Sequence, residues 1–220
     1  NFGGQYDQLI VRRVRELGVY ALLKDCDEKL TKEDLDSLAG IILTGGPQSV
    51  FDEKSLKVDP EIFELNVPIL EICYGMQTIA HYFGGEIEES DKGEYGKTPL
   101  FVDNRTALFE NVAQESTIWM NHRDSVVSLP ENFKKIARTL NCPIAGFENT
   151  EKNIYAVQFH PEVVHSEYGF TILENFVLKS EGTVSLTIGL DISKNVVVFK
   201  YQAKPKSLKD AKDEMAGQAK

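Results

Sequence analysis

The chain has 220 residues, of which 42% are hydrophobic and 26% charged, and its formal net charge at pH 7 is −10. These values are typical of one folded domain, alone or with a short appendage, and they exclude a largely disordered or collagen-like chain. The acidic balance argues against a nucleic-acid-binding groove, and no apolar run approaches the roughly 20 residues that a membrane span requires.

Charge is distributed unevenly along the chain. Residues 181–220 hold seven lysines and five acidic residues, a net charge of +2, so residues 1–180 carry −12. We therefore predict a main domain over 1–180 and an atypical tail over 181–220. In the tail, 184–190 and 195–201 have the pattern of a hairpin, and the Lys/Ala-rich end is predicted to be helical or disordered.

Strands alternate with helices in the first part of the main domain. The predicted order is helix 5–17, strand 19–23, helix 31–38, strand 40–43, short helix 60–65, strand 67–72 and helix 74–83. Strands are predicted next over 97–102, 116–120, 134–139, 143–147 and 154–158, followed by a helix over 168–179. This alternation predicts an α/β fold with an open, mostly parallel sheet and helices on both faces.

Cys73 stands between a buried strand and a helix, in the sequence Cys-Tyr-Gly. A sharp turn there would expose the sulfur beyond the strand end, and the helix N-terminus would favour the thiolate. The backbone N–H of Tyr74 would be placed to stabilise an oxyanion. A buried, inert cysteine at a strand end is the alternative interpretation.

Two other motifs follow predicted strands. His160-Pro161-Glu162 offers a base with a carboxylate two residues away to orient it, although such a motif taken alone is more often a solvated loop histidine beside a surface glutamate. Gly45 and Gly46 allow close backbone approach to a ligand and can present an oxyanion donor, or can form a simple turn. Open α/β sheets bind ligands at the carboxyl ends of their strands, so the three motifs together indicate acyl transfer through a thioester.

At these residues the sequence resembles the class I, triad-type glutamine amidotransferases, over about four-fifths of the chain. The motifs are GGP at 45–47, CYGMQ at 73–77 and QFHPE at 158–162. Other segments are similar to the glutaminase domains of the GMP synthase branch: FGGQY at 2–6, GPQSV at 46–50, GEYG at 93–96, WMNHRD at 119–124 and HSEYG at 165–169.

The resemblance implies a fold of the flavodoxin-like type and a role for each matching residue. Cys73 would be the nucleophile, His160 the base, and Glu162 its orienting partner, with the N–H groups of Gly46 and Tyr74 as oxyanion donors. The residues that would bind L-glutamine are Gly45, Gln77, Asn121, His122 and Asp124. The resemblance implies no metal or cofactor for the glutaminase chemistry. It implies a synthetase subunit or domain that uses ATP and Mg²⁺ to aminate XMP to GMP, and no nucleic-acid or membrane partner.

Several features depart from the family pattern. Glu71 and Arg123 stand where the family has glycine; Arg123 either narrows the pocket or points to solvent. The apolar first strand of the family is missing before residue 2, and we hypothesise that Asn195–Phe199 fills its place in the sheet. No Ser-Gly-Gly-Val-Asp-Ser-type pyrophosphate loop occurs, so the chain would need a separate synthetase subunit, or it is a fragment with a foreign tail.

Three functions remain open from the sequence. The first is a cytoplasmic glutaminase, which agrees with the absence of a visible secretory leader and an odd count of three cysteines. The second is a binding or regulatory module on the same fold, impaired by Glu71 beside the nucleophile. The third is a different cysteine hydrolase that acts on another γ-glutamyl amide or a peptide.

Overall fold

The computed structural model describes residues 6–24, 30–36, 38–46, 49–51, 59–179 and 196–200, the last of these by its backbone only. Within these ranges one sheet has the strand order β1-β9-β2-β3-β8-β7-β6-β4-β5. The strands are β1 (Ala21–Lys24), β2 (Leu38–Leu43), β3 (Ile69–Ile72), β4 (Glu86–Val102), β5 (Glu115–Ser128), β6 (Lys134–Arg138), β7 (Gly146–Asn149), β8 (Ile154–Val157) and β9 (Val196–Lys200). The helices are α1 (Asp7–Glu16), α2 (Lys32–Asp36), α3 (Tyr74–Tyr82) and α4 (Gly169–Lys179), with 3-10 turns η1 (Pro60–Glu64) and η2 (Ala107–Phe109).

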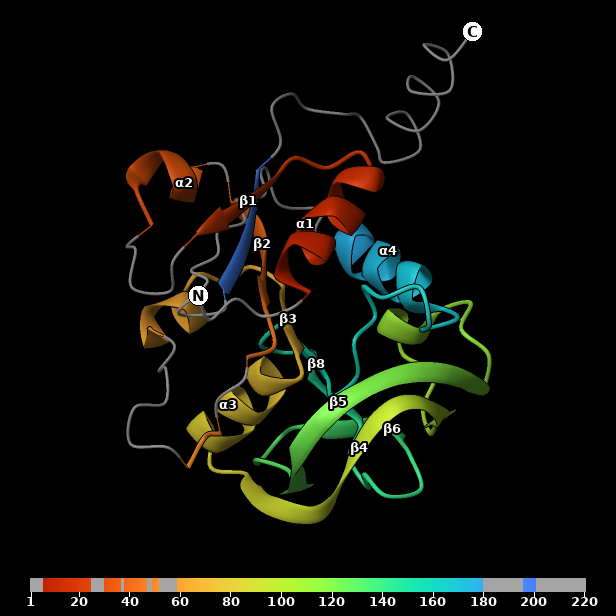
Figure 1. Ribbon diagram of the computed structural model, residues 1–220. Coiled ribbons are helices and arrows are strands. Elements are labelled where there is room, and N and C mark those ends of the chain that lie inside the picture. Colours follow the sequence, from red (N-terminus) through yellow and green to blue (C-terminus); the bar gives the residue numbers. More distant parts are fainter. Residues whose placement is uncertain are drawn as a thin grey trace, which may run out of the picture.

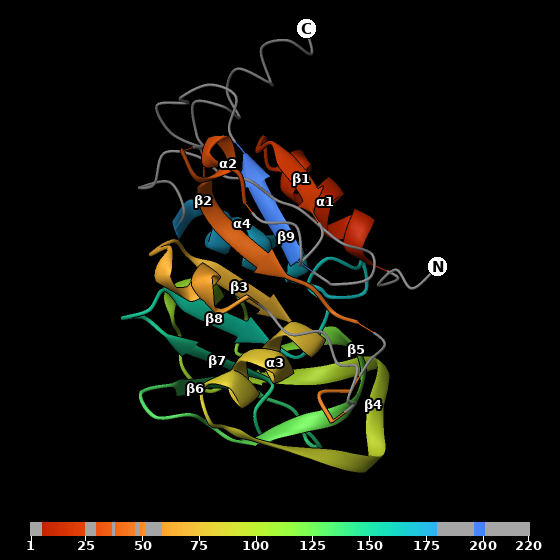
Figure 2. The ribbon, with the colours of Figure 1, turned by 90° about the vertical axis from the view of Figure 1, so that its left-hand side faces the viewer.

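Helices lie on both sides of the central strands. Strands β2, β3 and β8 run between α3 on one side and the contacting pair α1 and α4 on the other (Figures 1 and 2). The predicted α/β class is therefore confirmed. No helix among the described residues is long and apolar enough to cross a membrane.

The sheet is mixed, whereas the sequence predicted a mostly parallel one. Only the pairs β2–β3 and β3–β8 are parallel, and the other strand pairs are antiparallel. The reason lies in the connections. Parallel neighbours need a long crossover, whereas β4 to β8 follow one another through shorter turns and loops that suit antiparallel pairing.

The helix ends follow from local chemistry that the sequence already indicated. The N–H of Asp34 donates to the Thr31 hydroxyl at 3.1 Å, and the N–H of Thr31 donates back to the Asp34 carboxylate at 2.9 Å. Thr31 therefore caps α2. Gly18 follows α1 with a φ of 82°, a conformation that glycine adopts without steric cost.

β9 occupies an interior position in the sheet, between β1 and β2. Val197 and Val198 are in antiparallel register with Ile42 and Ile41 of β2, and the other edge of β9 pairs with β1. This confirms the hypothesis that the Val-rich segment near 195–199 lies beside the strand at 40–44. The two edges of β9 thus pair with β1 and β2, and neither pairs with a hairpin partner. The other predicted tail segments, 184–190 and 204–220, lie outside the described part of the chain.

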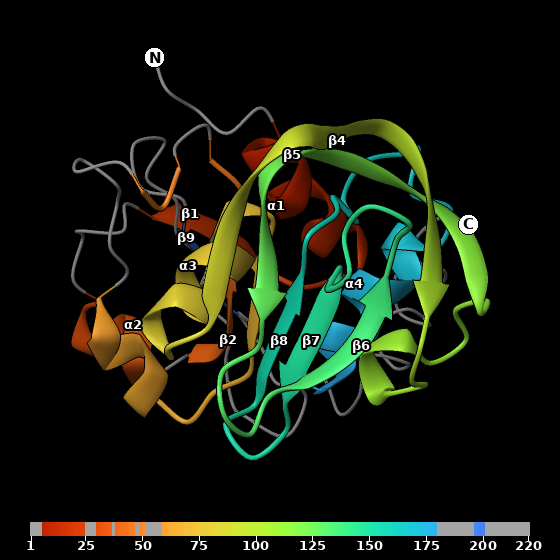
Figure 3. The same ribbon diagram turned by 90° about the horizontal axis from the view of Figure 1, so that it is seen from below.

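The long β4–β5 ribbon goes well beyond the strands that the sequence predicted at 97–102 and 116–120. It curls around the end of the molecule that lies lowest in Figure 1, and this end faces the viewer in Figure 3. Its register is interrupted between the pairs Glu89–Asp124 and Glu94–His122, where β4 has more residues than β5. Such an irregularity is typical of a bend in a two-stranded ribbon.

Candidate active site

Cys73 forms the turn between β3 and α3. Its φ of 55° and ψ of −108° lie in a region that residues other than glycine rarely adopt, and its N–H donates to Val157 of β8 at 2.8 Å. A Cβ on Gly75 would lie 2.8 Å from the carbonyl oxygen of Leu43, so α3 packs directly on β2. The strained turn and the close packing together hold the sulfur at the N-terminus of α3, as the nucleophile-elbow prediction requires.

His160 follows β8 and is held on several sides. Its Nδ1 lies 2.7 Å from a carboxylate oxygen of Glu162, and both side chains are buried. The His160 N–H donates to the carbonyl of Trp119 at 2.9 Å, and the Ser166 hydroxyl donates to the His160 carbonyl at 2.6 Å. The edge-to-face ring of Tyr6 lies 4.9 Å from the imidazole, centroid to centroid. The imidazole is therefore fixed in one orientation.

Gly45, after β2, lies against both reactive side chains. A Cβ built on Gly45 would be 3.2 Å from Cε1 of His160 and 3.7 Å from Sγ of Cys73. The sulfur and the imidazole thus converge on one point, and only glycine leaves that point open. The three motifs meet because they follow β2, β3 and β8, which are parallel neighbours in the sheet.

The pKa of His160 is raised well above its usual range. Burial alone would lower this pKa, but the charge of Glu162 and the nearby sulfur of Cys73 outweigh burial. The site therefore favours an imidazolium between a carboxylate and a sulfur. This is the protonation state needed to give a proton to a leaving group.

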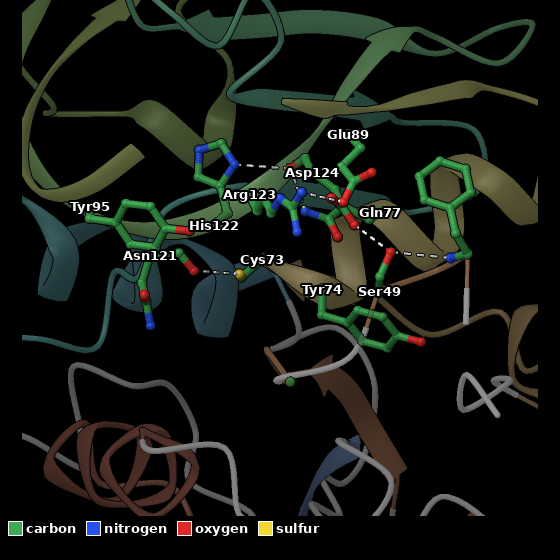
Figure 4. A pocket seen from close by; sticks show the side chains of 12 residues that line it. Ser49, Cys73, Tyr74, Gln77, Glu89, Tyr95, Asn121, His122, Arg123 and Asp124 are labelled. Atoms are coloured by element: carbon green, nitrogen blue, oxygen red, sulfur yellow. Dashed lines mark hydrogen bonds and ion pairs between the residues drawn. The ribbon is translucent and has the colours of Figure 1, made fainter. Parts of the chain in front are cut away.

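A cavity of about 770 Å³ opens beside Cys73 (Figure 4). Seven residues predicted for the site line it: Gly46, Cys73, Tyr74, Gln77, Asn121, His122 and Asp124. Gly45, His160 and Glu162 are not among the lining residues. Four further lining residues were not predicted from the sequence, namely Ser49, Phe51, Glu89 and Tyr95. Ser49 and Tyr95 belong to the GPQSV and GEYG segments, which carried a signal that could have identified them.

Polar side chains form the inner wall of the cavity. The amide nitrogen of Gln77 donates to the carbonyl of Asp124 at 2.7 Å and to Gln158 at 3.2 Å. The Ser49 hydroxyl donates to the Asp124 carboxylate at 2.6 Å. Because these groups bond to one another, the polar atoms that face the cavity are fixed before any ligand enters.

Arg123 is at the rim of the cavity. Its guanidinium lies 2.6 Å from the Glu89 carboxylate, and both side chains are more than half exposed. Of the two sequence alternatives, this favours a narrowed cavity over a side chain that points away into solvent. Figure 4 shows the pair beside Asp124.

Glu71 is fully buried, with an exposed fraction of 0%, and neither carboxylate oxygen has a hydrogen-bond partner among the described residues. It pairs in register with Leu43, whose side chain meets Gly75, so Glu71 also points toward α3. Burial raises the pKa of Glu71 well above its usual range, so the buried site favours the neutral carboxyl. A neutral carboxyl does not place a negative charge beneath Cys73.

Glu94, His122 and Cys142 form a buried cluster in which one potential ligand atom of each lies within 4.8 Å of the others. Both oxygens of Glu94 and both ring nitrogens of His122 are already within hydrogen-bond distance of protein partners. The Cys142 thiol donates to the carbonyl of Ile144 at 3.2 Å, and burial together with Glu94 raises its pKa to about 12. The cluster is therefore satisfied by protein hydrogen bonds alone.

Gly169→Ala is expected to destabilise the loop that carries His160. A Cβ at Gly169 would overlap the carbonyl of Pro161, where α4 begins against the loop. We expect the free energy of unfolding to fall by about 1–3 kcal/mol. Denaturant unfolding measures this effect, and Phe170→Ala, at an exposed position of the same helix, should change stability by less than about 0.5 kcal/mol. Equal effects of the two substitutions would contradict the close approach at Gly169.

Three features define a class of protein: the turn at Cys73, the pair of His160 and Glu162, and the mixed sheet. Comparison with known families identifies that class. The family model "Glutamine amidotransferase class-I" matches residues 1–180, and the chain belongs to this family.

The names of individual relatives are more specific than the name of the family. The chain is 51% identical over 179 residues to the glutamine-hydrolyzing GMP synthase of Acetivibrio thermocellus, covering 81% of this chain and 35% of the relative. It is 46% identical over 199 residues to that of Macrococcus caseolyticus, covering 88% and 39%. The chain therefore spans less than half the length of these relatives. A solved structure from Thermoplasma acidophilum, of a protein assigned as one subunit of a GMP synthase, has 34% identity and a TM-score of 0.65, with 83% of this chain and 92% of that chain covered.

Proposed function

We propose that the chain is the glutaminase component of a GMP synthase and hydrolyses L-glutamine through a thioester on Cys73. The observation that carries the proposal is the convergence of Sγ of Cys73 and the His160 imidazole at Gly45, with Glu162 behind the imidazole. The size of the adjoining cavity and its hydrogen-bonded polar wall suit a small amino-acid amide.

In the first step, His160 takes the proton of the Cys73 thiol, Sγ attacks the carboxamide carbon, and the carbonyl oxygen takes up the negative charge. We assign stabilisation of that oxyanion to the N–H of Tyr74, at the N-terminus of α3, together with the N–H of Gly46. His160 then protonates the nitrogen, and ammonia leaves as the C–N bond breaks. In the second step His160 takes a proton from water, which hydrolyses the thioester to glutamate and regenerates the thiol.

We assign L-glutamine binding to Gly45, Gln77, Asn121 and Asp124. Support comes from the cavity, which Gln77, Asn121 and Asp124 line together with Cys73. His122 also lines the cavity, but both of its nitrogens are within hydrogen-bond distance of protein atoms, so we assign it to shaping the site.

The ammonia would pass to a synthetase partner that aminates XMP with ATP and Mg²⁺. The length of the relatives supports a partner, because this chain corresponds to only 35–39% of them. We place the reaction in the cytoplasm, where free thiols such as that of Cys73 stay reduced. The intact geometry around the buried Glu71 favours an active glutaminase over an impaired binding module.

A diazo-ketone analogue of glutamine tests this proposal directly. We expect one covalent adduct per chain, mapped by mass spectrometry to Cys73, with ammonia release from glutamine in a parallel assay. Cys73→Ala should abolish both, and Cys142→Ala, at another buried cysteine, should retain both. Absence of an adduct would contradict the proposal, and an adduct that forms only after Glu71→Gly would identify the impaired module instead.

A further inference from the structure

The buried pair of Glu94 and His122 links the β4–β5 ribbon to the wall of the cavity. The two residues lie directly opposite each other in the antiparallel register. Nε2 of His122 is 3.3 Å from one carboxylate oxygen of Glu94, and the Thr139 hydroxyl donates to the other at 2.7 Å. Glu94 and His122 are 6% and 5% exposed, so water does not compete strongly for these hydrogen bonds.

The other ring nitrogen of His122 continues the chain of contacts. Nδ1 lies 2.9 Å from the carbonyl oxygen of Asp124, and the same oxygen accepts the 2.7 Å hydrogen bond from Gln77. A carbonyl oxygen only accepts, so Nδ1 carries a hydrogen. Glu94 thus reaches Gln77 through two intermediates, and Gln77 and Asp124 are the residues that fix the polar wall beside Cys73.

The protonation state of the pair follows from the partners. Nδ1 faces a carbonyl and Nε2 faces a carboxylate, so an ionised Glu94 is satisfied only when both nitrogens of His122 carry hydrogen. Burial alone would raise the pKa of Glu94, but hydrogen bonds from His122 and Thr139 outweigh it and lower the pKa. The carboxylate of Glu94 and the carbonyl of Asp124 therefore hold the His122 ring between them.

We infer that Glu94 is a positioning residue for glutamine binding, acting through His122 on the Asp124 carbonyl and on Gln77. The inference rests on the proposed glutaminase function. Glu94 itself is not among the lining residues and lies outside the reacting group of Cys73, His160 and Glu162. Its loss should therefore change how substrate is bound more than how bound substrate reacts.

Steady-state kinetics of glutamine hydrolysis test the inference. Glu94→Ala should raise KM at least about tenfold, because His122 would no longer hold the Asp124 carbonyl that accepts from Gln77. The kcat per active site should stay within about threefold of the wild-type value. Glu94→Gln should largely restore KM, since its amide can accept from Thr139 and donate to a neutral His122. The number of active sites is counted with the diazo-ketone analogue at saturation, so that misfolded protein does not distort kcat.

Glu148→Ala is the matched control. Glu148 is another strand glutamate with 6% exposure, but its neighbours are Thr106, Lys134 and Lys179 and it does not line the cavity. It should leave KM unchanged. An unchanged KM in Glu94→Ala, or an equal rise of KM in Glu148→Ala, would overturn the inference. In either case an active wild-type protein would still support the proposed glutaminase function. An inactive, unlabelled wild type would instead overturn the proposed function.

Discussion

Glu71→Gly should increase the free energy of unfolding at pH 7 by at least about 2 kcal/mol. The wild-type carboxyl is fully buried beneath α3 without a hydrogen-bond partner among the described residues, and its removal relieves that cost. Glycine adds backbone entropy to the unfolded chain, which offsets about 1 kcal/mol of the gain.

The gain should depend on pH in one direction. Burial raises the pKa of Glu71 in the folded state, whereas the carboxyl in the unfolded chain titrates near about 4.3. Above that pH the unfolded state has lost the proton and the folded state keeps it, so wild-type stability falls by about 1.4 kcal/mol per pH unit from this group. The loss continues until the folded carboxyl itself ionises. The advantage of Glu71→Gly should therefore be smallest near pH 4 and grow as pH rises.

Denaturant titrations at several pH values measure both effects. Glu71→Gln provides a matched variant of the same shape that cannot ionise, so it should lose the pH dependence of this group but keep an unpartnered polar side chain. Glu148→Gln should give a smaller change, because lysines near Glu148 oppose the effect of burial on its pKa. Stability curves for wild type and Glu71→Gly that run parallel across pH would show that Glu71 is not held neutral.

The sequence predicted those parts of the fold whose signal is local. Apolar runs at β2, β3 and β8 marked the central strands, and the parallel pairing of these strands then brought Gly45, Cys73 and His160 together. The extent of β4 was missed because residues 86–94 are mostly polar and charged, without the alternation that marks a half-buried strand. The pairing of Glu94 with His122 depends on the irregular register of β4 and β5, which only the folded ribbon determines.

Local signals were not sufficient to predict the antiparallel direction of the outer strands or the position of β9 in the sheet. Strand existence follows from composition, but direction and neighbours follow from how the connections run, which the apolar pattern does not encode. The position of Glu71 illustrates the opposite case. Its place two residues before Cys73 was sufficient to predict an effect on the nucleophile, and the structure adds that burial raises the pKa of Glu71, which weakens the effect of its charge on the sulfur.

Glu162→Ala should lower kcat for glutamine hydrolysis by about 10²–10⁴-fold with little change in KM. The carboxylate contacts Nδ1 of His160 at 2.7 Å and does not line the cavity, so its loss affects the orientation and charge of the base and not substrate contacts. Glu167→Ala is the matched control in the same loop. Glu167 is exposed and its carboxylate accepts only from the N–H of Thr117, so kcat should be unchanged.

Glu162→Gln separates orientation from charge, because its carbonyl can still accept from Nδ1 while the negative charge is gone. Burial lowers the pKa of His160 and the Glu162 charge raises it, so without that charge the imidazolium should lose its proton at lower pH. The alkaline limb of the kcat/KM profile should therefore move to lower pH. A profile that stays in place while kcat falls would assign Glu162 to orientation alone, and an unchanged kcat in both variants would remove it from the catalytic group.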